Sequence, residues 1–139
     1  FTADEVWRSR FGEGYVHDKL FVDVPAEWRD EVLAAKWKKV RDIRRVVTGA
    51  LELKRRDKVI GASLQAAPVV HVTDEDLRNA LDGVDLAETF ITSGVTLSAD
   101  EASTEAFRMQ EVKDVAVEFA MAEGGKCQRC WQILPEVTE

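Results

Sequence analysis

The chain has 139 residues, 45% of them hydrophobic and 32% charged, and its net charge of −7 and composition exclude global disorder. No apolar run approaches the roughly 18–20 residues that cross a bilayer, and no basic start followed by an apolar stretch indicates a signal peptide. Two cysteines do not make a disulfide framework, so we expect a cytoplasmic protein. Because the sequence starts without methionine and stops without an obvious end signal, we expect a fragment of something longer.

The first expected element is a short helix over residues 2–11. Thr2 and Glu5 have the spacing of a capping box, in which the threonine hydroxyl caps the helix and the glutamate reaches back to the cap amide. Gly12 ends the helix, and residues 12–25 are expected to form a loop.

The strongest periodic signal predicts a long helix from Pro25 to about Gly61. Gly49 lies in the middle of it, at a cost of about 1 kcal/mol relative to alanine, which predicts a close helix neighbour there. Apolar residues at three- and four-residue steps form one stripe, which consists of Leu33, Trp37, Val40, Ile43, Val47, Ala50 and Leu51.

The same stretch concentrates positive charge. Between Lys36 and Lys58 there are ten basic and three acidic residues, a balance of +7, whereas the rest of the chain has a balance of −14. A basic stretch attracts phosphate backbones and acidic partners, and it is equally consistent with a solvated helix face. The candidate contacts are the cations off the apolar stripe, namely Lys38, Arg41, Arg45, Arg55 and Arg56.

Beyond Gly61 the pattern predicts a small α/β part and a tail, which makes the fold class α+β. Residues 98–110 fit a helix and a loop equally well, and the tail occupies residues 123–139. The other expected elements are a strand interrupted by Pro68, a helix and two further extended segments, over residues 63–72, 73–81, 90–97 and 115–121.

The tail contains Cys127 and Cys130, whose spacing is that of half a zinc knuckle. A structural zinc needs four ligands, and His17 and His71 are each alone and far away along the chain. Two alternatives stay open. One is a redox pair, which needs a helix start after the motif, where Pro135 argues against it. The other is a pair of thiols without a function.

Trp131 follows the second cysteine, beside Lys126 and Arg129. An aromatic ring between cations can stack on a nucleobase, and it can also cover a metal site. No phosphate-binding loop and no nucleophile elbow is present, so we predict no catalytic residues in this chain.

Three motifs in this order resemble one family: the helix from Trp37 to Glu52, K-x-I-G-x-S-L at residues 58–64, and K-C-x-R-C-W at residues 126–131. With the opening F-T-A-D-E-V-W, they make essentially the whole chain similar to the C-terminal region of bacterial isoleucyl-tRNA synthetases, which are class I aminoacyl-tRNA synthetases.

The resemblance implies a parent that uses ATP to join isoleucine to its tRNA, with catalytic and editing domains upstream that alone bind ATP and Mg²⁺. It implies that residues 1–60 are the end of a helical anticodon-binding bundle, that residues 61–122 are a small α/β subdomain, and that the chain holds the anticodon stem-loop of tRNA(Ile). The parent is expected to be a cytoplasmic monomer.

The resemblance also implies that Cys127 and Cys130 are two of four zinc ligands, with the second pair further along the parent. We therefore expect zinc in the parent and only half of its site here. Lys126, Arg129 and Trp131 are further candidate tRNA contacts. The competing hypothesis is a free-standing module without ligase activity, whose basic helix binds an acidic protein or RNA.

Overall fold

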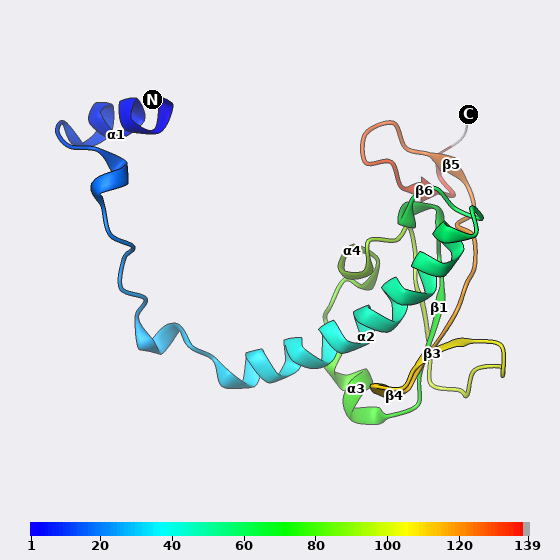
Figure 1. The fold of residues 1–139 in the computed structure, drawn as a ribbon. Coiled ribbons are helices and arrows are strands. Elements are labelled where there is room, and N and C mark those ends of the chain that lie inside the picture. The colour runs from blue at the N-terminus through cyan, green and yellow to red at the C-terminus, as the bar shows by residue number, and fades with distance from the viewer. Residues whose placement is uncertain (138–139) are drawn as a thin grey trace. The chain divides into compact units, whose positions relative to one another are not determined.

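The computed structural model describes residues 1–137 and divides the chain into two compact units, residues 1–31 and a second unit that begins at Val32 (Figure 1). The observed secondary structure is mixed α and β, as the sequence predicts. Among the described residues, no helix is both long enough and apolar enough to cross a membrane.

The first unit contains α1 (Thr2–Phe11) and the short 3₁₀ helix η1 (Val16–Asp18). Asp4 joins them, because its Oδ1 accepts a hydrogen bond from the amide of Val16 at 3.0 Å. The expected bounds of α1 are confirmed, but the capping box is wrong. Phe1 is the N-cap and its carbonyl already accepts from the Glu5 amide, so Thr2 lies inside the first turn, where its hydroxyl makes no cap.

The long helix α2 runs over Glu31–Arg56, which is shorter at both ends than the sequence predicts. Pro25 caps a separate 3₁₀ turn, η2 (Ala26–Trp28), and Arg29 is extended, so the chain leaves the helical conformation before α2 begins. At the other end Lys58 adopts a left-handed φ of 59°, which ends the helix before Gly61.

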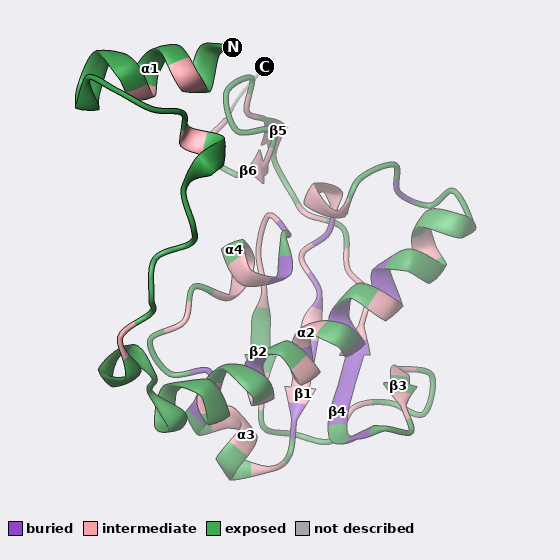
Figure 2. Cartoon of the chain, turned by 60° about the vertical axis from the view of Figure 1, so that its left-hand side comes forward, coloured by how far each residue is buried: buried purple, intermediate pink, exposed green. Residues whose placement is uncertain are grey.

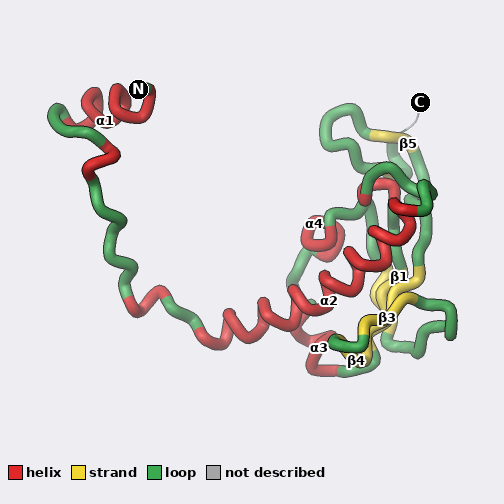
Figure 3. The backbone as a smooth tube through the Cα atoms, viewed as in Figure 1, coloured by secondary structure: helices red, strands yellow, loops and turns green. Residues whose placement is uncertain are grey.

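A four-stranded sheet has the order β2-β1-β4-β3, with β1 (Val69–Val72) parallel to β2 (Thr96–Ser98). The other two strands, β3 (Phe107–Met109) and β4 (Val112–Glu118), join it antiparallel (Figure 3). The 3₁₀ helix η3 (Ser63–Gln65) precedes β1. Strand β4 starts three residues before the segment that the alternating pattern indicates.

Two short helices connect β1 to β2. The first, α3 (Glu75–Ala80), is capped by the Asp74 carboxylate and matches the expected helix. The second is α4 (Leu86–Phe90). The predicted strand over residues 90–97 is wrong in its first part, because Phe90 is helical and only residues 96–98 form strand β2. The expected strand over 63–72 is likewise extended only from Val69.

The hydrophobic core lies between α2 and the sheet (Figure 2). Helix α2 contributes Val40, Ile43, Val46, Val47, Ala50 and Leu51, which are 0–4% exposed. The first part of the expected apolar stripe is not in this core, since Leu33 is 48% and Trp37 38% exposed.

Gly49 has a close neighbour, but the neighbour is a strand and not a helix. A Cβ at this position would lie 3.0 Å from Cε1 of Phe107 and 3.7 Å from the sulfur of Met109, both on β3. The missing side chain therefore lets α2 approach the edge of the sheet.

The tail forms a two-stranded hairpin from β5 (Gly125–Lys126) and β6 (Ile133–Leu134). Ser93 fastens it to the rest of the second unit. Its hydroxyl donates to the Leu64 carbonyl at 2.5 Å and accepts from the Ile133 amide at 2.7 Å.

Candidate nucleic-acid interface and cysteine turn

One face of α2 carries an exposed polar stripe on the side away from the core. Its members recur at three- and four-residue steps, which places them on one side of a helix. They are Lys38, Arg41, Arg45, Thr48, Glu52 and Arg55. Of the five cations on this helix that the sequence predicts as tRNA contacts, four therefore share one face. The fifth, Arg56, is exposed at the C-terminal end of the helix.

Acidic neighbours partly compensate this stripe. The Asp42 carboxylate lies 3.9 Å from Lys38 Nζ and 3.2 Å from Arg45 Nη2. Such exposed pairs contribute about 0–1 kcal/mol each, so a phosphate can compete for the cations. Arg41 is exposed and has no ion-pair or hydrogen-bond partner within residues 1–137.

The two nominated arginines near the helix end also have acidic neighbours. Arg55 Nε lies 3.6 Å from Glu52, and Arg56 Nε lies 3.3 Å from Asp57. More than half of each arginine side chain is exposed, so both guanidinium groups remain accessible to a ligand.

Other cations of the basic stretch contact the rest of the second unit. Lys39 Nζ lies 2.6 Å from Asp76, Lys36 donates to the Asp82 carbonyl at 2.7 Å, and Lys54 Nζ lies 5.5 Å from the centre of the Phe119 ring. The charge pattern in the sequence does not show which cations are engaged in this way, because the residues that they contact lie in distant segments of the chain.

The cysteines lie on a closed turn at the tip of the tail hairpin. The Cys127 amide donates to the Gln132 carbonyl at 2.8 Å, and the Trp131 amide donates to the Cys127 carbonyl at 2.9 Å. The Cys130 thiol donates to the Gln132 side chain at 3.4 Å. Gln132 therefore accepts hydrogen bonds from both cysteines, through its backbone carbonyl and its side chain, a role that the spacing of the cysteines in the sequence does not indicate.

The Cys127 sulfur accepts hydrogen bonds from the turn. The backbone amide of Cys130, followed by that of Arg129, lowers the pKa of the Cys127 thiol below its ordinary value, although desolvation opposes them. Amide groups that stabilise a thiolate also suit a sulfur that ligates a metal.

These two sulfurs are half of a zinc donor set. Within the described part of the chain, no cluster of three or more His, Cys, Asp or Glu side chains could hold a metal. His17 lies near Asp4 in the first unit, and His71 lies on β1. The residues present therefore do not complete a tetrahedral site. A redox motif of the thioredoxin type is not supported either, because the motif is followed by β6 and not by a helix.

Trp131 presents its ring to solvent beside a cation. The side chain is 63% exposed, and Lys126 Nζ lies 5.5 Å from the ring centre. Arg129 is also exposed. Across residues 1–137, no hydrogen bond, ion pair or ring contact joins these three residues to the cations of α2.

Comparison with known proteins identifies close relatives. No family model matches the chain. It is 52% identical over 138 residues to an isoleucine–tRNA ligase of Agrobacterium fabrum, 55% identical over 139 residues to that of Ruegeria pomeroyi, and 51% identical over 138 residues to that of Caulobacter vibrioides. Each match covers 99% of this chain, which spans 14% of each relative's length. The resemblance drawn from the motifs is thereby confirmed: the chain is homologous to one segment of the isoleucine–tRNA ligases.

Proposed function

We propose that this chain is a tRNA-binding segment of an isoleucine–tRNA ligase and holds the anticodon stem-loop of tRNA(Ile). The supporting observation is the exposed polar stripe of α2, in which Arg41 is unpaired among residues 1–137 and the side chains of Lys38, Arg45 and Arg55 are each more than half exposed. Cations in this arrangement contact phosphates and set the register of an RNA, whereas contacts to unstacked bases provide specificity.

The tail supplies a second group of proposed contacts. An exposed ring beside cations can stack on an unpaired base, which favours Trp131, Lys126 and Arg129 as contacts to the anticodon loop. In this proposal the parent is a cytoplasmic, monomeric ligase that joins isoleucine to tRNA with ATP and Mg²⁺, and this segment takes no part in the chemical step. Zinc binding by Cys127 and Cys130 would require ligands from outside residues 1–137.

A titration tests the α2 contacts. Labelled tRNA(Ile) and a polyglutamate of matched charge are titrated with the chain at about 50 mM and about 200 mM salt, and binding is followed by fluorescence anisotropy. We expect a preference for tRNA and a steep loss of affinity with salt. Replacing both Arg41 and Arg45 with alanine should reduce the slope of log K against log salt by about one per lost phosphate contact.

The matched control removes two exposed cations elsewhere, by R10A and K113A together, and should leave the slope nearly unchanged. An unchanged slope for the R41A/R45A variant would remove these residues from the interface. Equal binding of tRNA and polyglutamate would overturn the tRNA proposal and favour an acidic-protein partner.

A further inference from the structure

One row of residues crosses all four strands of the sheet. The register pairs His71 with Ser98 of β2 and with Ala116 of β4, and it pairs Ala116 with Arg108 of β3. Side chains alternate between the two faces of a strand, and the core residues Val115 and Val117 flank Ala116 on β4. The row therefore lies on the outer face, away from α2.

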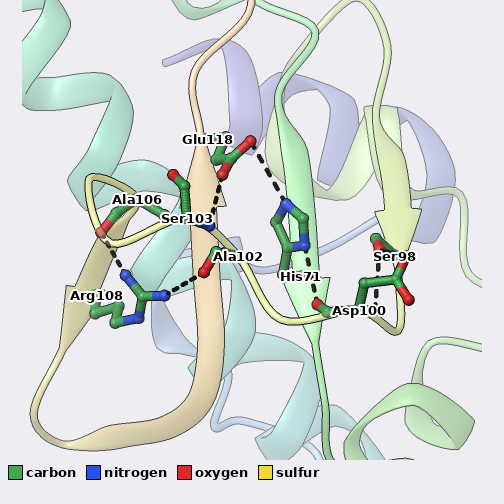
Figure 4. Close-up of polar contacts among 8 residues, drawn as sticks. All are labelled: His71, Ser98, Asp100, Ala102, Ser103, Ala106, Arg108 and Glu118. Atoms are coloured by element: carbon green, nitrogen blue, oxygen red, sulfur yellow. Dashed lines mark hydrogen bonds and ion pairs between the residues drawn. The ribbon is translucent and has the colours of Figure 1, made fainter.

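The connection from β2 to β3 joins the opposite edges of the sheet, and its contacts with His71, Glu118 and Arg108 place it over this row. We call residues 99–106 the strap. His71, Glu118 and Arg108, each from a different strand, hold it (Figure 4).

The contacts to the strap are polar. His71 Nδ1 lies 3.0 Å from the Asp100 carbonyl, and the Ser103 amide donates to Glu118 Oε1 at 2.9 Å. The Arg108 guanidinium donates to the carbonyls of Ala102 and Ala106, at 3.1 and 3.0 Å (Figure 4). Most of the strap is exposed, so little apolar burial holds it in place.

The position of the His71 ring determines where its proton must be. The Asp100 carbonyl can only accept, so Nδ1 carries a hydrogen. In the neutral ring Nε2 is then an acceptor. Nε2 is buried, makes no hydrogen bond within residues 1–137, and lies 3.7 Å from Glu118 Oε2. Neutral His71 therefore places an acceptor opposite a carboxylate, whereas the imidazolium places a donor there.

Glu118 is charged in this arrangement. The Ser103 hydroxyl and amide, and to a smaller extent His71, lower the pKa of its carboxyl group, although desolvation opposes them. The remaining charged groups on this face are either engaged or line an adjacent cavity of ≈ 700 Å³. The Asp100 carboxylate accepts from the Ser98 hydroxyl, Arg108 donates to the strap, and the cavity is lined by Glu101, Lys113 and Asp114 as well as by His71 and Arg108.

We propose that protonation of His71 clamps the strap onto the sheet. The imidazolium donates from Nδ1 to the Asp100 carbonyl and from Nε2 to the Glu118 carboxylate, and it thereby joins β1, β4 and the strap. This contact exists only while the ring carries both protons, and it is lost when the ring is neutral and Nε2 has no hydrogen to donate. The strap then loosens, together with the wall of the cavity that Glu101 and Ala102 form.

Nuclear magnetic resonance of the complete 139-residue chain tests the clamp. The exchange rate of the Ser103 amide, divided by its intrinsic rate, is measured between about pH 5.5 and about pH 8, and ¹⁵N signals report the protonation of the His71 ring. We expect about tenfold greater protection at the acid end, which is the effect of one charge-assisted hydrogen bond, with a midpoint that coincides with the ring titration.

Three variants make the test specific. H71Q should abolish the pH dependence. E118Q should abolish or reverse it, because the glutamine oxygen can still accept from the Ser103 amide while its NH₂ group can donate only to the neutral His71 ring. H17Q changes the other histidine and should leave the profile unaltered. Protection that is independent of pH in the unmodified chain, or greater protection at acid pH that persists in E118Q, would overturn the proposal even if H71Q does not fold.

Discussion

Cys127 shows how a turn changes the chemistry of a single side chain. Backbone hydrogen bonds from Cys130 and Arg129 lower the pKa of its thiol. The thiolate therefore forms at lower pH in the folded chain than in the unfolded chain, where these amides are not held in place.

The pH profile of alkylation measures this effect. In a C130S variant, which leaves one thiol, the rate of Cys127 alkylation by iodoacetamide should reach its midpoint at lower pH in the native chain than in denaturant. C127S provides the reciprocal control, because it identifies the signal from the other cysteine. Coincident native and denatured profiles for Cys127 would contradict the role of the amides.

Gly49 shows where interpretation of single residues reaches its limit. A glycine in a strongly periodic helix predicts a close helix neighbour, and the close neighbour is present but belongs to a strand, β3. The sequence does not identify Phe107 as the neighbour, since 58 positions separate the two residues and only the packing of α2 against β3 brings them together.

At the scale of elements, the tail hairpin depends on two glycines, Gly124 and Gly125. Gly124 has a φ of 120°, and a Cβ there would overlap the Leu134 carbonyl. A Cβ on Gly125 would overlap the carbonyl of Val137. Both glycines therefore allow one backbone segment to approach another closely.

We predict that G124A disrupts the β5–β6 hairpin. The amides of Cys127 and Ile133, which are hydrogen-bonded in the native hairpin, should lose protection from hydrogen exchange. G83A is the matched control. Gly83 has a φ of 72° but open space around it, so alanine there costs about 1 kcal/mol of backbone strain and causes no overlap. Equal effects of the two variants on the hairpin amides would refute the close-approach explanation.

The elements differ in how far local sequence predicts them. Helices α2 and α3 follow from apolar periodicity and from a capping carboxylate. Helix α4 has only five residues, too few for a period, and its capping residue Asp85 lies in a stretch that also favours a turn. The position of β3 is likewise decided by pairing with β4, since residues 98–110 have no periodic signal of their own.

At the scale of the whole molecule, the buried hydrophobic residues among residues 1–137 all belong to the second unit. They extend from Val40 to Val117, and neither α1 nor the two 3₁₀ helices of the first unit contain a buried residue. Hydrophobic burial is the dominant favourable term in folding, so the second unit has the larger share of the stability.

Removal of residues 1–30 should therefore leave the urea midpoint of the remaining chain close to that of the complete chain. I43A in the complete chain is the positive control, because truncation of this fully buried side chain should lower the free energy of unfolding by about 2–5 kcal/mol. Circular dichroism measures both transitions. A large fall in the midpoint after truncation would contradict an independent core.

Part of the candidate interface follows from the sequence, and part of it depends on tertiary contacts. The exposed face of α2 follows from helical periodicity alone, since residues opposite an apolar stripe lie in solvent, and Arg41 and Arg45 satisfy this rule. Helical periodicity does not show whether a cation forms an ion pair with another element. Lys39 is paired with Asp76 because α3 lies against that part of α2, a contact between residues 37 positions apart. That the exposed cations contact tRNA stays a prediction.

Local pattern was sufficient for the α+β class and the long basic helix, because each depends on neighbouring residues or on one helical period, and the family followed from the resemblance of three motifs. Strand pairing, the closure of the tail by Ser93 and the crossing of the strap over His71 depend on contacts between distant segments. No local pattern encodes such contacts, since the free energy that selects them comes from burial and hydrogen bonds that exist only when the segments have come together.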